Sequence, residues 1–175
     1  MERKPIKNTY SQYTIPKSKF QIGLILNSLT SFEVNRKIRE LQRLVKPFNS
    51  NIFKDFLCDN GIEFDDAQEL EVDEETAEVV GHVFYTRPYC SGDKGSCERN
   101  HEFFRYVIKK GTSLNNLTQE SLNLIFSHIN SYPRKSLEYK TPYEVFSELY
   151  GEYVINQLDI KKNRIQRFEI KEVNK

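Results

Sequence analysis

Several residue types are scarce or absent in this 175-residue chain, and these absences narrow its class. Tryptophan is absent, and the three cysteines, Cys58, Cys90 and Cys97, form an odd count without disulfide-like spacing. Such cysteines indicate a reducing compartment, so we expect an intracellular, cytoplasmic protein. No apolar run approaches the ~20 residues that cross a bilayer. The first four residues lead into no apolar signal segment, so we expect no membrane association.

Basic residues are absent from one part of the chain. Residues 55–78 hold eleven of the 25 acidic residues and no lysine or arginine. The rest of the chain therefore carries 26 basic and 14 acidic residues, a net charge of +12. A basic body is typical of proteins that bind a polyanion. A solvated acidic loop beside ordinary charged faces would give the same count, so charge leaves both interpretations open.

The apolar pattern predicts an α/β fold. A strand over 20–26, a helix from Thr30 to just before Pro47 and a strand over 52–58 predict a parallel crossover. The strand over 52–58 is rich in apolar residues, as expected when both of its faces are covered. A short helix in the acidic segment, a strand over 82–86 and helices over 97–110, 118–130, from 141 onward and 153–158 complete the prediction. Thr30 with Glu33 forms one predicted capping box, and Thr141-Pro142 with Glu144 forms another.

The stretch "CDNGIEF", residues 58–64, places Asp59 directly after a predicted strand. In an open α/β sheet, functional groups collect beyond the carboxyl ends of the strands. Glu98 follows 39 positions later, early in a predicted helix, and two such carboxylates can jointly hold Mg²⁺ for phosphodiester chemistry. Asp-Asn-Gly is also a strong turn signal, and a glutamate near a helix start complements the helix dipole. The residues alone leave these readings open.

Three segments together resemble a known family. They are "CDNGIEF", "RPYCSGDKGSCERNHEFFRYVIKKGT" (87–112) and "INSYPRKSLEYKTPYEVF" (129–146), which look like the carboxyl half of DDE transposases of the insertion-sequence-thirty group. The residues that match the family pattern are Asp59, Asn60, Gly61, Glu63, Phe64, Pro88, Tyr89, Ser91, Gly95, Glu98, Arg105, Lys110, Gly111, Thr112, Asn130, Pro133, Arg134, Lys135, Leu137, Thr141, Pro142, Glu144 and Phe146.

The resemblance implies a ribonuclease-H-like fold, that of the retroviral integrase core, with a mixed sheet, flanking helices and additional carboxyl-terminal helices. It implies that Asp59 and Glu98 are the second and third acids of a catalytic triad and bind Mg²⁺ or Mn²⁺. It also implies DNA as the partner, both the insertion-sequence ends and the target, in a bacterial cytoplasm. The nucleic-acid-binding residues that we expect are Arg134 and Lys135 on an exposed loop, with Lys94 and Arg105.

The sequence departs from the family pattern at its start. The family's first aspartate would fall at about Met1, yet residues 1–54 contain no aspartate, and we expect the family's amino-terminal helix-turn-helix region to be missing. Gly92, Cys97 and Ala67 also depart from the family pattern, and the acidic segment lengthens the spacing between the two acids. We therefore expect a truncated transposase, inactive alone. Its predicted units are a partial core over 1–112 that lacks its first strand, and a helical extension with a basic tail over 113–175.

Two other readings stay open. The charge excess and the carboxyl-terminal helices also suit a non-catalytic DNA-binding or dimerising remnant that modulates an intact transposase, as a homodimer or together with the full-length protein. A zinc module would use Cys90, Cys97 and His101, with Cys58 as a fourth ligand. Six residues separate Cys90 from Cys97, whereas two to four are typical of zinc knuckles, so we disfavour zinc.

Overall fold

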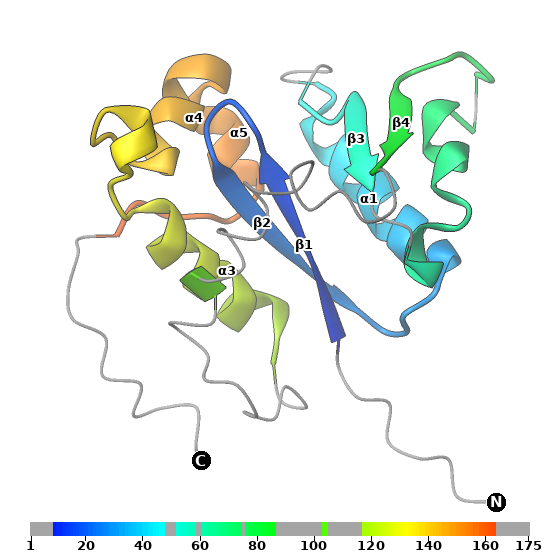
Figure 1. Cartoon of the computed structure of the whole chain (residues 1–175), viewed down its shortest axis with the longest axis horizontal. Coiled ribbons are helices and arrows are strands. Elements are labelled where there is room, and N and C mark those ends of the chain that lie inside the picture. Colours follow the sequence, from blue (N-terminus) through cyan, green and yellow to red (C-terminus); the bar gives the residue numbers. More distant parts are fainter. Residues whose placement is uncertain are drawn as a thin grey trace, which may run out of the picture.

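The computed structural model describes residues 9–47, 52–58, 61–74, 76–86, 103–104 and 117–163. Its strands and α-helices, shown in Figure 1, are β1 (Thr9–Ile15), β2 (Phe20–Leu26), α1 (Ser31–Val45), β3 (Asp55–Cys58), β4 (His82–Tyr85), α3 (Gln119–Asn130), α4 (Pro142–Tyr150) and α5 (Glu152–Gln157). Its short 3-10 helices are η1 (Ile62–Phe64), η2 (Ala67–Glu71) and η4 (Lys135–Leu137). The mixture of strands and helices agrees with the predicted α/β class. No helix in the described ranges is long and apolar enough to cross a membrane.

The strands form two separate pairs among the described residues. β1 and β2 make an antiparallel hairpin with Thr9 opposite Leu26 and Ile15 opposite Phe20. β3 and β4 are parallel, with Asp55 opposite His82 and Cys58 opposite Tyr85. Among the described residues, the strands over 20–26 and 52–58 do not pair with each other, so the predicted crossover does not join neighbouring strands. β2 pairs with β1, a strand that we did not predict, through the four-residue connection 16–19.

Helix α1 begins as the capping pattern predicts, with one difference. The Thr30 hydroxyl accepts a hydrogen bond from the Glu33 backbone N–H at 3.3 Å. The Glu33 carboxylate does not return the bond to Thr30. It accepts from the backbone N–H of Asn27 at 3.1 Å and from the guanidinium of Arg36. One face of α1 is apolar and buried, and its members are Val34, Ile38, Leu41 and Val45.

The larger apolar core lies between the hairpin and the carboxyl-terminal helices. The rings of Phe20 and Phe146 stack with their centroids 4.3 Å apart, and Phe126 of α3 is fully buried. The Asn130 side chain ties α3 to β2, because it accepts from the Gln21 N–H and donates to the Gln21 carbonyl, both at 2.8 Å. Residues on both sides of position 112 share this core, and the domain boundary proposed there stays a prediction.

A second, smaller core lies beneath α1. It joins Leu26 of β2, Val34 and Ile38 of α1, Cys58 of β3 and Leu70 of η2. Helix α1 thus packs on both strand pairs and connects them.

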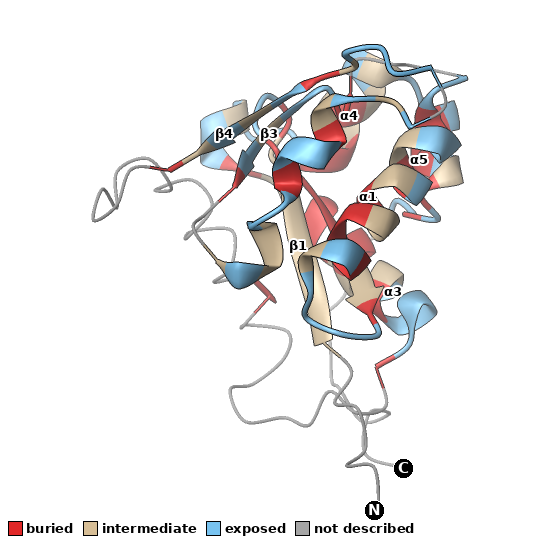
Figure 2. Cartoon of the chain, turned by 90° about the vertical axis from the view of Figure 1, so that its right-hand side faces the viewer, coloured by how far each residue is buried: buried red, intermediate tan, exposed pale blue. Residues whose placement is uncertain are grey.

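Strand β3 is shorter and less covered than we predicted. Only Asp55–Cys58 is extended, and the expectation of a strand covered on both faces is wrong. Cys58 is buried, whereas Leu57 and its partner Phe84 on β4 are each 56% exposed. Figure 2 shows exposed residues along both strands. An apolar run alone does not tell which of its residues face the core.

The carboxyl-terminal helices follow their sequence signals. The Thr118 hydroxyl accepts from the Ser121 N–H and caps α3. Both hydrogen bonds of the predicted capping box are present between Thr141 and Glu144, with Pro142 at the first position of α4. Of the helix predicted over 97–110, only Phe103 and Phe104 are described, and they are helical.

Candidate functional site

Neither predicted catalytic carboxylate lies among the described residues, and only Asp59 directly follows a described element. β3 ends at Cys58, directly before Asp59, and the chain is described again from Gly61. Asp59, Glu98, Lys94 and Arg105 all lie outside the described residues, and so do three of the cysteine and histidine positions considered for zinc. Within the described ranges, no cluster of histidine, cysteine, aspartate or glutamate has the makings of a metal site.

The end of β3 lies in a negatively charged environment. Cys58 is 5% exposed and belongs to the core cluster against which Tyr13 of β1 and Tyr85 of β4 pack. Burial raises the pKa of Tyr13, and the nearby negative charge of Glu63 adds to the increase. Burial also raises the pKa of Tyr85, with further contributions from the carboxylates that follow β3, including Asp65. An excess of negative charge at this strand end favours a bound cation.

Tyr85 makes a hydrogen bond to the segment that follows β3. Its hydroxyl donates a hydrogen bond to the carbonyl of Phe64 at 2.9 Å, which joins β4 to η1. The chain on both sides of residues 59–60 is therefore held to the parallel strand pair.

Arg134 is buried, which contradicts the expectation of an exposed loop position. Its side chain packs flat on Phe103, with the guanidinium carbon 3.4 Å from the ring centroid, and it is only 7% exposed. One guanidinium nitrogen donates to the Ile129 carbonyl at 3.3 Å. Burial lowers the pKa of Arg134 to about 10. The predicted contact of Arg134 with DNA stays a prediction, although the free chain holds this side chain away from the surface.

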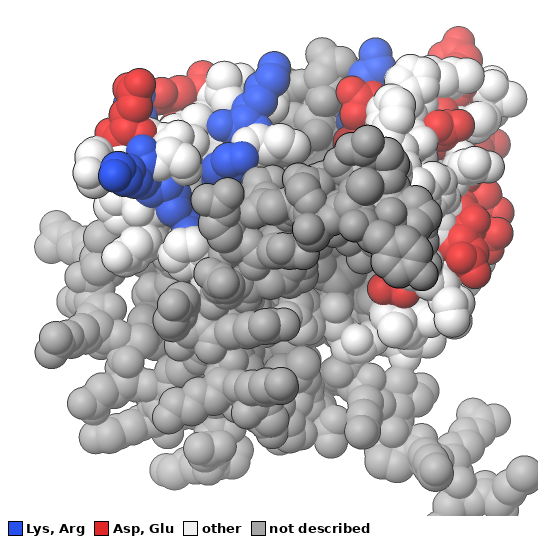
Figure 3. Space-filling view, in the orientation of Figure 1, with Lys and Arg blue, Asp and Glu red and all other residues white. Residues whose placement is uncertain are grey.

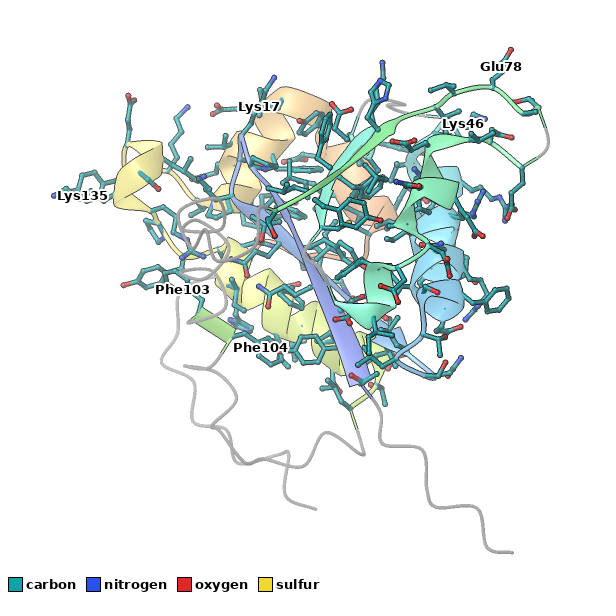
Figure 4. The ribbon with its side chains drawn as sticks, turned by 45° about the vertical axis from the view of Figure 1, so that its right-hand side comes forward. Lys17, Lys46, Glu78, Phe103, Phe104 and Lys135 are labelled. Carbon is teal, nitrogen blue, oxygen red and sulfur yellow. The ribbon has the colours of Figure 1, made fainter. Side chains whose placement is uncertain are left out.

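Lys135 has the exposure that a phosphate contact requires. It lies at the start of η4 and points outward in Figure 4, at the same end of the molecule as the exposed Lys17 in the β1–β2 turn. Figure 3 shows basic side chains together with a group of acidic ones in its upper-left part, which contains this turn and the carboxyl-terminal helices. Acidic side chains dominate its right-hand edge.

The acidic segment does not extend freely into solvent. After η2, the bridge between Val72 and Val79 closes a short hairpin, which ion pairs hold to the outer face of α1. The pairs join Glu74 to Arg39 at 3.3 Å, Glu74 to Arg43 at 3.2 Å and Asp73 to Lys46 at 3.2 Å. We missed this contact, although the basic residues recur every three or four positions and so share one helix face.

Comparison with known proteins identifies relatives for most of the chain. No protein-family model matches. The chain is 31% identical over 129 residues to the transposase InsI of the insertion sequence element IS30C of Escherichia coli K12, an alignment that covers 74% of this chain and 32% of the relative. It is 27% identical over 111 residues to the transposase of IS1086 from Cupriavidus metallidurans, covering 63% of this chain and 30% of that protein. A third relative, the transposase of IS4351 from Bacteroides fragilis, is 30% identical over 103 residues, covering 57% and 29%.

These alignments confirm the relationship that the motifs around Asp59, Glu98 and Arg134 predicted. The chain spans about a third of the length of the relatives that it matches. It is homologous to the transposases of insertion sequences, including those of IS30 elements.

Proposed function

We propose that this chain is a portion of an insertion-sequence transposase that acts on DNA by metal-dependent phosphoryl transfer, with Asp59 and Glu98 as metal ligands. The observation that carries the proposal is the alignment with an IS30 transposase over 74% of the chain. The proposed partners are the DNA of the element ends and the target.

The position of Asp59 supports a metal site. The parallel strands β3 and β4 end side by side at Cys58 and Tyr85, and Asp59 is the next residue after β3. Carboxylate oxygens are the ligands that Mg²⁺ and Mn²⁺ prefer, and the carboxylates around Tyr85 add negative charge there. When bound, the ion would polarise a phosphodiester oxygen. Asp59 and Glu98 would hold it, and Lys135 would contact the DNA backbone.

The order of elements supports the ribonuclease-H-like part of the proposal. An antiparallel hairpin, a helix and a parallel strand pair follow one another, and α1 packs on both pairs through Leu26 and Cys58. We infer that the two pairs belong to one mixed sheet whose central strand, with the first catalytic aspartate, is not supplied by the described residues.

The chain by itself is expected to be inactive, because it supplies two of the three acids. Residues 1–54 contain no aspartate, and the glutamates of α1 have other roles. Glu33 is buried against Arg36, and Glu40 is paired with Arg36 and Lys37 on the helix surface. Losing one essential electrostatic contact of this kind costs about 3–4 kcal/mol of transition-state stabilisation.

A titration with Mn²⁺ tests the metal site without requiring activity. Calorimetry on the whole chain is expected to show one weak site that is lost in Asp59→Asn and in Glu98→Gln. Glu78→Gln removes an exposed carboxylate of the same acidic segment and is expected to leave binding unchanged. If all three variants lose Mn²⁺ binding equally, the ion is attracted by overall negative charge and is not held at a specific site. Metal-dependent nicking of a labelled element end by this chain, lost in Asp59→Ala, would contradict the inactivity.

The second candidate function is a DNA-binding or dimerising remnant that modulates an intact transposase. The exposed apolar pair Leu57 and Phe84 on the parallel strands favours association with another chain. Co-purification with a full-length relative, weakened by Leu57→Ser and by Phe84→Ser, would support this role. A chain that stays monomeric and binds no relative would rule out the dimerising role.

A further inference from the structure

The acidic hairpin, defined here as residues 71–74 and 76–80, is a folded element. The Asp73 N–H donates to the Glu78 carbonyl at 2.9 Å, and the Val80 N–H donates to the Glu71 carbonyl at 2.8 Å. The hairpin lies over the carboxyl-terminal half of α1 and Lys46, whereas the Glu78 side chain points away into solvent (Figure 4). The described acidic residues of the hairpin are therefore not equivalent: Asp73 and Glu74 pair with basic residues of α1 and with Lys46, whereas Glu78 points away from them.

The contact with α1 has a rigid part and an exchangeable part. The Arg39 side chain is 15% exposed and donates to the carbonyls of Glu69 at 2.8 Å and Val72 at 3.4 Å, so it anchors the hairpin backbone. The side chains of Arg43 and Lys46 are 61% and 64% exposed and pair only through their charged ends. Exposed pairs of this kind are weak, so another anion can replace the carboxylates at little cost.

This contact borders an open groove of about 640 Å³, which basic residues line together with Asp73 and Glu74. Arg43, Lys46 and Lys54 all line this groove, and Lys54, just before β3, is exposed and without an ion pair within the part of the chain that the structure describes. The apolar side chains of Val45 and Phe53 also line it. Three exposed cations around one groove fit a chain of phosphates better than they fit the two carboxylates of Asp73 and Glu74.

We propose that Arg43, Lys46 and Lys54 form a contact surface for a nucleic-acid phosphate backbone, and that Asp73 and Glu74 of the acidic hairpin occupy it in the free chain. This inference rests on the proposed function, since DNA is the partner. The hairpin acts as an intramolecular competitor: it lowers the affinity for DNA, and phosphates displace it when they bind. The acidic segment and the basic excess of the rest of the chain then act together, because the acidic segment covers part of the basic surface until DNA binds.

Fluorescence anisotropy with a 20-base-pair duplex of random sequence, measured over a range of salt concentrations, tests the inference on the whole chain. Glu74→Gln frees Arg43 and is expected to tighten binding about three- to tenfold at low salt, the scale of one or two exposed ion pairs. The log–log salt slope is expected to steepen by about one for each freed cation. Glu78→Gln changes the net charge equally without freeing a partner and is expected to change the affinity less than twofold. Adding Arg43→Gln and Lys46→Gln to Glu74→Gln is expected to abolish the gain.

Each other outcome contradicts a defined part of the account. Equal tightening in Glu74→Gln and Glu78→Gln would reduce the effect to overall charge and overturn the inference alone. If Glu74→Gln binds DNA more weakly and also unfolds at a lower temperature, the contact between the hairpin and α1 stabilises the fold and does not compete with DNA. The same measurement can be made with heparin as the polyanion. If Glu74→Gln binds heparin more tightly than the parent chain does but binds DNA no more tightly, DNA is excluded as the occupant of this surface. No DNA binding by any variant would overturn both the inference and the proposed action on DNA.

Discussion

Replacing Gly23 with alanine is expected to disrupt the contact between the hairpin and α3. A Cβ atom at this position would lie 2.1 Å from Cε2 of Phe126 and 2.8 Å from Cδ2 of Leu122. Both side chains are fully buried, so neither can move into solvent. Overpacking of a core costs about 1–3 kcal/mol, and a clash with two buried side chains belongs at the upper end. For a chain of this size, a loss of about 3 kcal/mol lowers the melting temperature by roughly 6–12 °C.

Thermal and urea unfolding, followed by circular dichroism, measure this effect. Phe126→Leu alone removes part of the core and is expected to be destabilising. In the double variant Gly23→Ala/Phe126→Leu, the smaller side chain leaves room for the new methyl group, so the two losses are expected to sum to less than their separate values. A Gly23→Ala chain within about 0.5 kcal/mol of the parent would refute the close packing of β2 on α3.

Three further perturbations follow from single contacts. Asn130→Ala leaves the buried N–H and carbonyl of Gln21 without partners and is expected to cost about 2–4 kcal/mol in urea unfolding, whereas an unchanged midpoint would refute the link. The hydrogen bond from Arg36 lowers the pKa of Glu33, so Glu33 contributes stability above its unfolded pKa that is lost as the pH falls through the folded value. Stability measured from pH 6 to pH 3 is expected to fall less steeply in Glu33→Gln, and parallel curves would contradict this. Thr141→Ala removes the cap of α4 and is expected to cost about 1 kcal/mol, with Thr141→Ser close to the parent as the check.

Local sequence signals predicted the helices well, because each depends on neighbouring residues. The helix that starts after Thr30, the helix predicted over 118–130 and the capping box at Thr141 all appear where the sequence predicted them. The family motifs likewise predicted the relationship to transposases before any comparison. In both cases the information lies within a few consecutive positions.

Strand pairing and burial were harder to predict, because they depend on residues far apart in the chain. Nothing near Phe20 tells that β2 pairs with the preceding segment and not with β3. Arg134 looked like a surface residue beside Lys135, yet the ring of Phe103, 31 positions earlier, covers it. The ion pair between Glu74 and Arg43 also joins distant segments, although a search for complementary charge spacing on α1 would have suggested it.

The placement of Asp59 and Glu98 is the centre of the proposed function, and anomalous diffraction from crystals grown with Mn²⁺ tests it most directly. We expect a manganese peak beyond the ends of β3 and β4, with a carboxylate oxygen of Asp59 and one of Glu98 each within about 2.0–2.6 Å of it, the range of hard-cation bonds to oxygen. A peak bound by other residues, or the two carboxylates on opposite faces of the strand pair, would contradict the account.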